Sequence, residues 1–229
     1  MAATVRGRCI GVAALYLLAA TMSGTALAGE TTSPGGLVQT VDVTQSEDVV
    51  LSQKIRAADG SVPPVANLLT VKLPRGAEPD FGRFSKCHLG RLVARGPRGC
   101  PRGSKVGRGS AAGSYAQQPM PSEPVRARLW LYNGHRFLGR RTLLAYARPD
   151  RGRTWIGVGR WSRRSARTEL DFQAFPRGVI PEGPQTYLDT LRLSISRTFL
   201  DVECGSSWSI ASLLATGAKV STSDRTACP

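Results

Sequence analysis

Short stretches in which apolar and polar residues alternate constrain the fold of this chain more than any other feature. The clearest is residues 125–134, VRARLWLYNG, where every second residue from Val125 to Leu131 is apolar. Alternation with a period of two is typical of a strand with one buried face, and Asn133-Gly134 is a favoured hairpin turn. The opposite face of this strand carries Arg126, Arg128, Trp130 and Tyr132.

Other segments of similar length show the strand pattern, and Gly, Pro, Ser or Asp clusters separate them. Helical spacing appears only in a short stretch around Leu89, Leu92 and Val93, which predicts a short helix at 88–95. The pattern therefore predicts an all-β fold of antiparallel sheets, a sandwich or a barrel. The further predicted strands are 37–44, 67–74, 140–148, 153–161, 168–175, 188–199, 206–215 and 218–223.

The first 28 residues have the organisation of a secretory signal peptide. Arg6 and Arg8 precede an apolar run, and Ala26-Leu27-Ala28 is a small-x-small cleavage site. A membrane anchor is the alternative, but the apolar run is short for a span. We expect cleavage before Gly29, no transmembrane segment afterwards, and a secreted or cell-envelope-associated protein. The expected division is a signal peptide at 1–28, a flexible tail at 29–36, and one β-rich domain at 37–229 with a long basic loop at about 96–124.

Cleavage removes Cys9 and leaves an even number of cysteines, which indicates disulfides in an exported chain. Four cysteines allow three pairings, and the sequence does not choose among them with certainty. Proximity along the chain favours Cys87–Cys100 and Cys204–Cys228. Closing each loop stabilises the fold by about 3 kcal/mol in the chain-entropy model.

The charge of the chain is concentrated in its middle. Without the leader, 29 basic residues face 16 acids, a net charge of +13, and residues 83–167 hold twenty of these bases against Glu123 and Asp150 alone. Such a segment attracts anionic envelope polymers or lipid head groups. Nucleic acid is disfavoured, because the chain is exported and has no nucleic-acid-binding motif. Codon bias in a GC-rich genome is the alternative origin of so many arginines.

A binding surface is the functional hypothesis that the motifs leave open. If 125–132 and 153–161 are neighbouring strands, the polar face of the first shares its side with aromatic and basic residues of the second. Guanidinium groups bind phosphate or carboxylate, and aromatic rings stack on sugars. The alternative is that the tryptophan side is core and the arginine stems lie at its margin. The candidate binding residues are Arg126, Arg128, Trp130, Tyr132, Arg153 and Trp155, with Trp161 nearby.

The sequence does not contain the motifs typical of metal binding, nucleophilic catalysis or nucleotide binding. Zinc needs four ligands in close pairs, whereas Cys87 and Cys100 stand thirteen apart and the chain has two histidines. The G-x-S-x-G elbow and phosphate-binding glycine loops are missing. Glu169 and Asp171 are expected to project from one face of a strand and could pair as the acids of a glycan hydrolase. The alternative is a solvent-exposed face that offsets nearby arginines. No metal, cofactor or catalytic residue is therefore predicted, and an enzyme is the less favoured class.

Part of the chain resembles a known sequence layout. The layout has an LP-x-G strand end, then C…CP-x-GS-x-VG and a C-terminal C-x(n)-C strand pair, and the likeness covers most of residues 68–228. The chain is similar in this to a group of secreted β-rich proteins of high-GC Gram-positive bacteria. The resemblance implies a secreted β-rich fold with two sequential disulfides and implies no activity.

These observations predict a secreted, non-enzymatic β-sandwich that binds anionic envelope or extracellular polymers through its arginine-rich middle. One alternative is a secreted glycan-directed hydrolase that uses Glu169 and Asp171. Another is a structural module whose partner is a protein, for which an exposed apolar patch would be the signal.

Overall fold

The fold is described from a computed structural model of the whole chain. The structure describes residues 29–32, 36–61, 66–117, 120–151, 154–164, 167–173, 185–214 and 217–228. The predicted signal peptide and the candidate binding residue Arg153 lie outside these residues. In the described part, no helix is long and apolar enough to cross a membrane.

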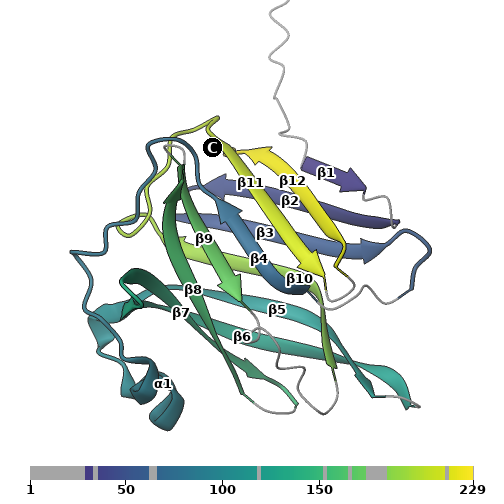
Figure 1. Cartoon of the computed structure of the whole chain (residues 1–229), viewed down its shortest axis with the longest axis horizontal. Helices are drawn as coiled ribbons and strands as arrows, with labels where there is room; N and C mark the ends of the chain where they lie inside the picture. The colour runs from purple at the N-terminus through teal and green to yellow at the C-terminus, as the bar shows by residue number, and fades with distance from the viewer. Residues whose placement is uncertain are drawn as a thin grey trace, which may run out of the picture.

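Strands make up most of the described residues, with one short α-helix and two 3-10 turns (Figure 1). The predicted all-β fold with a short helix is thus confirmed. The elements are β1 (Gly29–Thr32), β2 (Leu37–Gln45), β3 (Asp48–Ala57), β4 (Ala66–Lys72), α1 (Leu89–Arg95), η1 (Gly96–Gly99), η2 (Arg102–Ser104), β5 (Lys105–Gln117), β6 (Met120–Phe137), β7 (Arg140–Pro149), β8 (Trp155–Arg164), β9 (Arg167–Gln173), β10 (Gln185–Ser196), β11 (Ser207–Leu214) and β12 (Lys219–Arg225).

The described strands form one antiparallel sheet in the order β1-β2-β3-β10-β5-β6-β7-β8-β9-β4-β11-β12. The sheet curls until its two ends meet, so that it is nearly closed into a barrel (Figure 1). The backbone of Ala227 joins the ends, because its N–H donates to Val43 and its carbonyl accepts from Gln45, both over 2.8 Å. Asp224 also accepts from the backbone N–H of Val43.

The main core lies inside the curled sheet and receives apolar side chains from almost every strand. Val41, Leu51, Leu131, Leu170 and Ile210 are examples from five strands, and each is buried. Alternate residues of a strand point to opposite faces. The inward residues of each strand therefore fill one continuous core, while the residues between them face outward.

A second, smaller core lies on the outer face of β6, β7 and β8. It contains Tyr132 and Leu144 from the sheet and Cys87 and Leu92 from the segment that crosses over it. The helix α1 lies in that segment, at the lower left of Figure 1. The Cys87–Cys100 disulfide closes the segment, so that the loop covers a patch of the sheet.

Both disulfides favoured by proximity are confirmed, as Cys87–Cys100 and Cys204–Cys228. The predicted helix is also confirmed, and it ends at Gly96, which has a positive φ of 59°. Each predicted strand has a counterpart, although the ends differ by a few residues.

Three segments differ from the prediction. Residues 29–32, expected in a flexible tail, pair with β2 as β1. β3 was not predicted, because its inward Gln53 interrupts the apolar alternation. The expected long loop at 96–124 instead contains β5, a central strand that pairs on both sides with β10 and β6. Its glycines are needed there, since a Cβ on Gly109 would lie 2.3 Å from the carbonyl oxygen of Arg192.

The hairpin turn predicted at Asn133-Gly134 is wrong. β6 continues through these residues to Phe137, and the turn is at Leu138-Gly139, where both φ values are positive. Asn133 is buried, and its side-chain amide donates to the carbonyls of Phe81 and Phe84. A Cβ on Gly134 would lie 2.1 Å from Thr142 Oγ1. The pair therefore serves close packing within a strand.

Candidate functional site

The candidate site begins with two arginines on the outer face of β6. Leu129 and Leu131 of this strand are buried on the inward face, and Arg126 and Arg128 alternate with them and are exposed. The predicted division of this strand into two faces is therefore present in the structure.

Neighbouring strands bring three further exposed arginines to the same outer face. Arg148 on β7 lies directly opposite Arg128, and on the other side Ser110 of β5 separates Arg128 from Arg192 of β10. Arg108 of β5 lies opposite Trp130. We define the arginine face as the five exposed residues Arg108, Arg126, Arg128, Arg148 and Arg192.

The guanidinium groups of the arginine face are not neutralised within the described part of the chain. The ion pairs found there involve other residues, such as Arg163 with Glu78 and Arg197 with Asp201. The nearby Asp150 accepts a hydrogen bond from the backbone N–H of Arg126, not from its side chain. Like charges directly opposite each other on adjacent strands are destabilising. The pairing of Arg128 with Arg148 thus has an electrostatic cost that an anion would relieve.

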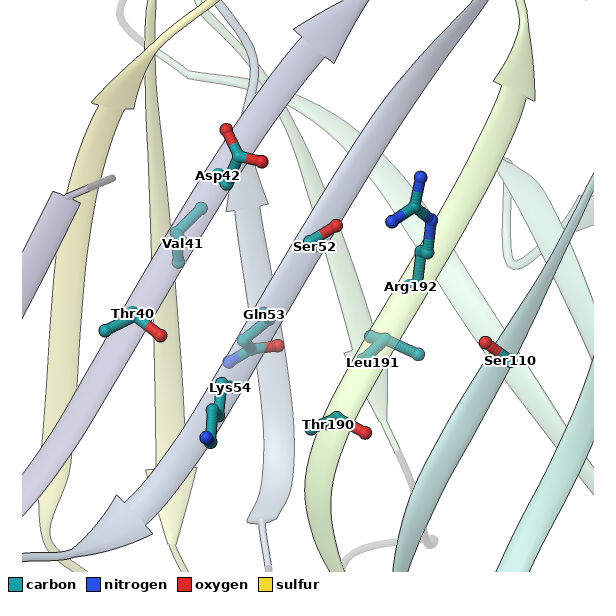
Figure 2. A pocket seen from close by; sticks show the side chains of 10 residues that line it. All are labelled: Thr40, Val41, Asp42, Ser52, Gln53, Lys54, Ser110, Thr190, Leu191 and Arg192. Atoms are coloured by element: carbon teal, nitrogen blue, oxygen red, sulfur yellow. The ribbon is translucent and has the colours of Figure 1, made fainter. Parts of the chain in front are cut away.

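A shallow hollow of about 350 Å³ adjoins the arginine face and shares Arg192 with it. Figure 2 shows its lining on β2, β3, β10 and β5. Lys54 and Arg192 supply positive charge, and Asp42 lies at the β2 side. Four hydroxyl groups complete the lining, those of Thr40, Ser52, Ser110 and Thr190. Cations beside hydroxyl donors can hold a phosphate or carboxylate group together with a sugar hydroxyl.

The aromatic residues of β6 are covered to different degrees by the α1 segment. Tyr132 is only 4% exposed and belongs to the second core, and burial raises the pKa of its phenol, with a smaller contribution from Tyr146. Trp130 is half-buried and meets Tyr146 edge to face, with ring centroids 5.8 Å apart. Tyr132 is therefore closed to a ligand, while Trp130 borders the arginine face.

The structure does not bring Trp155 to the arginine face. β7 lies between β6 and β8. Trp155 of β8 lies opposite Ala147 of β7, and Ala147 lies opposite Leu129 of β6, which points inward. Trp155 packs against the main core beside Phe172, and Trp161 is buried in that core. Both tryptophans thus point inward, in agreement with the alternative interpretation that the tryptophan side belongs to the core.

The two acids considered for a hydrolase face the outside of β9, and each has a partner on β4. The Lys72 ammonium is 3.6 Å from a carboxylate oxygen of Glu169, and Thr70 Oγ1 donates to Asp171 over 2.8 Å. Glu169 is buried. This arrangement makes the acids cross-strand partners and adds no support to a hydrolase.

His88 and His135, the two histidines of the chain, stack on each other with ring centroids 3.6 Å apart. Desolvation lowers the pKa of His135, and the positive charges of His88, Lys86 and Arg91 lower it further. The folded state therefore binds the His135 proton less tightly than the unfolded chain, whose histidine pKa is about 6.5.

Stability should accordingly fall as the pH drops through about 6.5, because protonation of His135 favours the unfolded chain. We expect the melting temperature of the wild type to fall between about pH 8 and pH 5 by more than that of His135→Gln, in which this group cannot titrate. The check is thermal unfolding of both proteins over this range. Parallel pH profiles would contradict the assignment to His135.

Arg108, Arg148, Arg192 and the hydroxyl-lined hollow were not predicted as parts of the site. Their residue types carry no signal alone, and only the cross-strand register places them beside Arg128. Comparison of the chain with protein-family models, with curated proteins and with solved structures gives no match.

Proposed function

We propose that this protein binds anionic polymers of the cell envelope without transforming them, and that the arginine face is the binding surface. The observation that carries the proposal is a set of five exposed arginines on one face of the sheet, three of them in one cross-strand row, with no acid paired to them among the described residues. Guanidinium groups bind phosphates and carboxylates in a bidentate way.

The geometry of the arginine face suits a repeating anion. Adjacent strands lie about 4.8 Å apart, so Arg148, Arg128 and Arg192 follow one line across β7, β6, β5 and β10 at intervals of about 5 to 10 Å. A chain with an anionic group on each repeat unit can meet several of them at once. The hollow at the end of this line offers hydroxyl groups and Lys54 for a sugar or polyol unit.

The test is titration with poly(glycerol phosphate), using dextran as the uncharged comparison. The triple variant Arg128→Ser/Arg148→Ser/Arg192→Ser should lose about tenfold in affinity, since each exposed charged contact contributes up to about 1 kcal/mol. Wild-type binding should also weaken as salt screens the charges, and the polymer should raise the melting temperature by binding the folded state.

A matched variant separates the arginine face from net charge. Arg75→Ser/Lys219→Ser/Arg225→Ser removes three exposed cations that lie outside the arginine face. Its affinity should stay within about twofold of the wild type, because screening limits the effect of distant charges. Equal losses in the two triple variants, or binding to dextran, would refute the proposal.

A further inference from the structure

In the part of the chain that the structure describes, five large apolar side chains are exposed, and four of them come from two adjacent segments. Leu89 and Val93 of α1 are 37% and 63% exposed, and Phe137 and Leu138 at the β6–β7 turn are 46% and 78% exposed. The fifth, Leu213, belongs to β11. We call the first four residues the apolar tip.

Backbone and side-chain contacts hold the two segments of the apolar tip together. The N–H of Cys87 donates to the carbonyl of Asn133 over 2.8 Å, and the N–H of His135 donates back to Cys87 over 3.2 Å. The stacked rings of His88 and His135 lie next to these contacts. Residues four apart share one side of a helix, so Leu89 and Val93 expose one side of α1 while Leu92 is buried beneath it.

Leu138 occupies a backbone conformation that suits glycine or asparagine. Its φ is +50°, and Gly139 follows at +75°. A bulky residue in this region of φ is strained. Because Leu138 is exposed, its side chain also adds little hydrophobic stabilisation to the fold. Strain of this kind points toward a functional constraint at the turn. Leu138 is therefore poorly explained by the stability of the isolated fold.

Positive charge lies beside the apolar tip. Arg91 and Arg95 are exposed on α1, Arg136 and Arg140 flank the turn, and the sequence has no acid between Asp80 and Glu123 or between Glu123 and Asp150. The guanidinium of Arg160 lies over the Phe137 ring, 5.4 Å from its centroid. Apolar side chains next to arginines match the depth profile of an anionic bilayer, in which phosphates lie above the acyl chains.

We propose that the apolar tip docks on an anionic lipid bilayer. Phe137, Leu138, Leu89 and Val93 enter the interface below the head groups, and the neighbouring arginines extend to lipid phosphates. This site differs from the arginine face in its residues and in its ligand, and it does not rest on the polymer-binding function proposed above.

The experiment measures how much of the protein cosediments with lipid vesicles. The protein is recovered after export, and its mass is measured to check that the leader has been removed. Vesicles contain phosphatidylcholine alone or with about 30% phosphatidylglycerol, a content at which anionic lipid attracts basic segments. The wild type should bind the anionic vesicles at least about tenfold more tightly. Leu138→Asn should lose about tenfold in affinity for them, because it removes an inserted apolar side chain.

Leu138→Asn also keeps the test independent of folding. Asparagine tolerates positive φ, so its melting temperature should equal or exceed that of the wild type. Leu213→Thr removes an exposed apolar side chain from β11 and should leave vesicle binding unchanged. The triple variant Arg128→Ser/Arg148→Ser/Arg192→Ser should keep vesicle affinity within about threefold, since these charges lie outside the tip.

Three results would overturn the docking proposal. Leu138→Asn could bind anionic vesicles as tightly as the wild type, or the wild type could bind neutral and anionic vesicles alike. Alternatively, Leu138→Asn could convert a sedimenting dimer into a monomer, which would make the tip a contact between two copies of the chain. Vesicle binding without polymer binding would refute only the polymer-binding function.

Discussion

Replacing Trp208 by alanine is expected to lower the free energy of unfolding by about 3–5 kcal/mol, as for other large-to-small changes in a core. Trp208 is 1% exposed on the inward face of β11, and its indole N–H donates to Thr226 Oγ1 over 2.7 Å. The change leaves a cavity and removes a buried hydrogen bond. A loss of this size is a large part of the 5–15 kcal/mol typical of a domain.

Urea unfolding measures this loss, and Trp208→Phe is the matched control. Phenylalanine keeps most of the apolar volume but has no N–H donor, so it should cost about 1–3 kcal/mol, the penalty of an unmatched buried polar group. The slope of the unfolding free energy against urea should stay unchanged if only stability is affected. A loss below about 1 kcal/mol in the alanine variant would contradict the central place of Trp208 in the core.

Gln39→Ala is the second change with a large expected effect, about 2–4 kcal/mol, because it orphans buried polar groups. Gln39 is fully buried inside the sheet. Its amide N–H donates to the carbonyl of Ile210, and its side-chain oxygen accepts from Gln53 and Ser212. The cluster connects β2 and β3 with β11 across the interior, so the loss of one member leaves the others with fewer partners.

The control for this prediction removes the polar cluster as a unit. Gln39→Leu/Gln53→Leu/Ser212→Ala leaves no side chain of the cluster without a partner, and joint apolar replacement of buried polar groups is often close to neutral. Chemical denaturation should place this triple variant nearer to the wild type than Gln39→Ala. If the triple variant were the less stable of the two, packing rather than hydrogen bonding would explain the cost.

The sequence predicted the fold class because most strands present a regular inward row of apolar residues. β6 is the clearest case. The same criterion missed β3, since Gln53 points inward, where its amide N–H donates to Ser212 Oγ on a strand distant in sequence. It also missed β5, where glycines usually taken as loop residues allow close contact with β10. Both β3 and β5 form because of their pairing with other strands, and this pairing cannot be read from the sequence of one segment alone.

The candidate site was predictable only in part, for a related reason. Alternation along β6 was enough to place Arg126 and Arg128 on one face. Arg192 reaches that face only because β10 pairs with β5, which a local pattern does not reveal. Trp155 was expected there on the assumption that β6 and β8 are neighbours, whereas the intervening β7 and the register turn it inward.

The closure of the sheet affects how this polypeptide reaches its native state. β2 is made early, but the backbone N–H of Val43 donates to the carboxylate of Asp224, 181 residues further along the chain. Ala227 supplies the remaining backbone partners. Contacts so distant in sequence slow folding, and an open strand edge invites pairing with other chains. This edge of β2 therefore stays unpaired until the residues around Asp224 have been made, which exposes the nascent chain to aggregation.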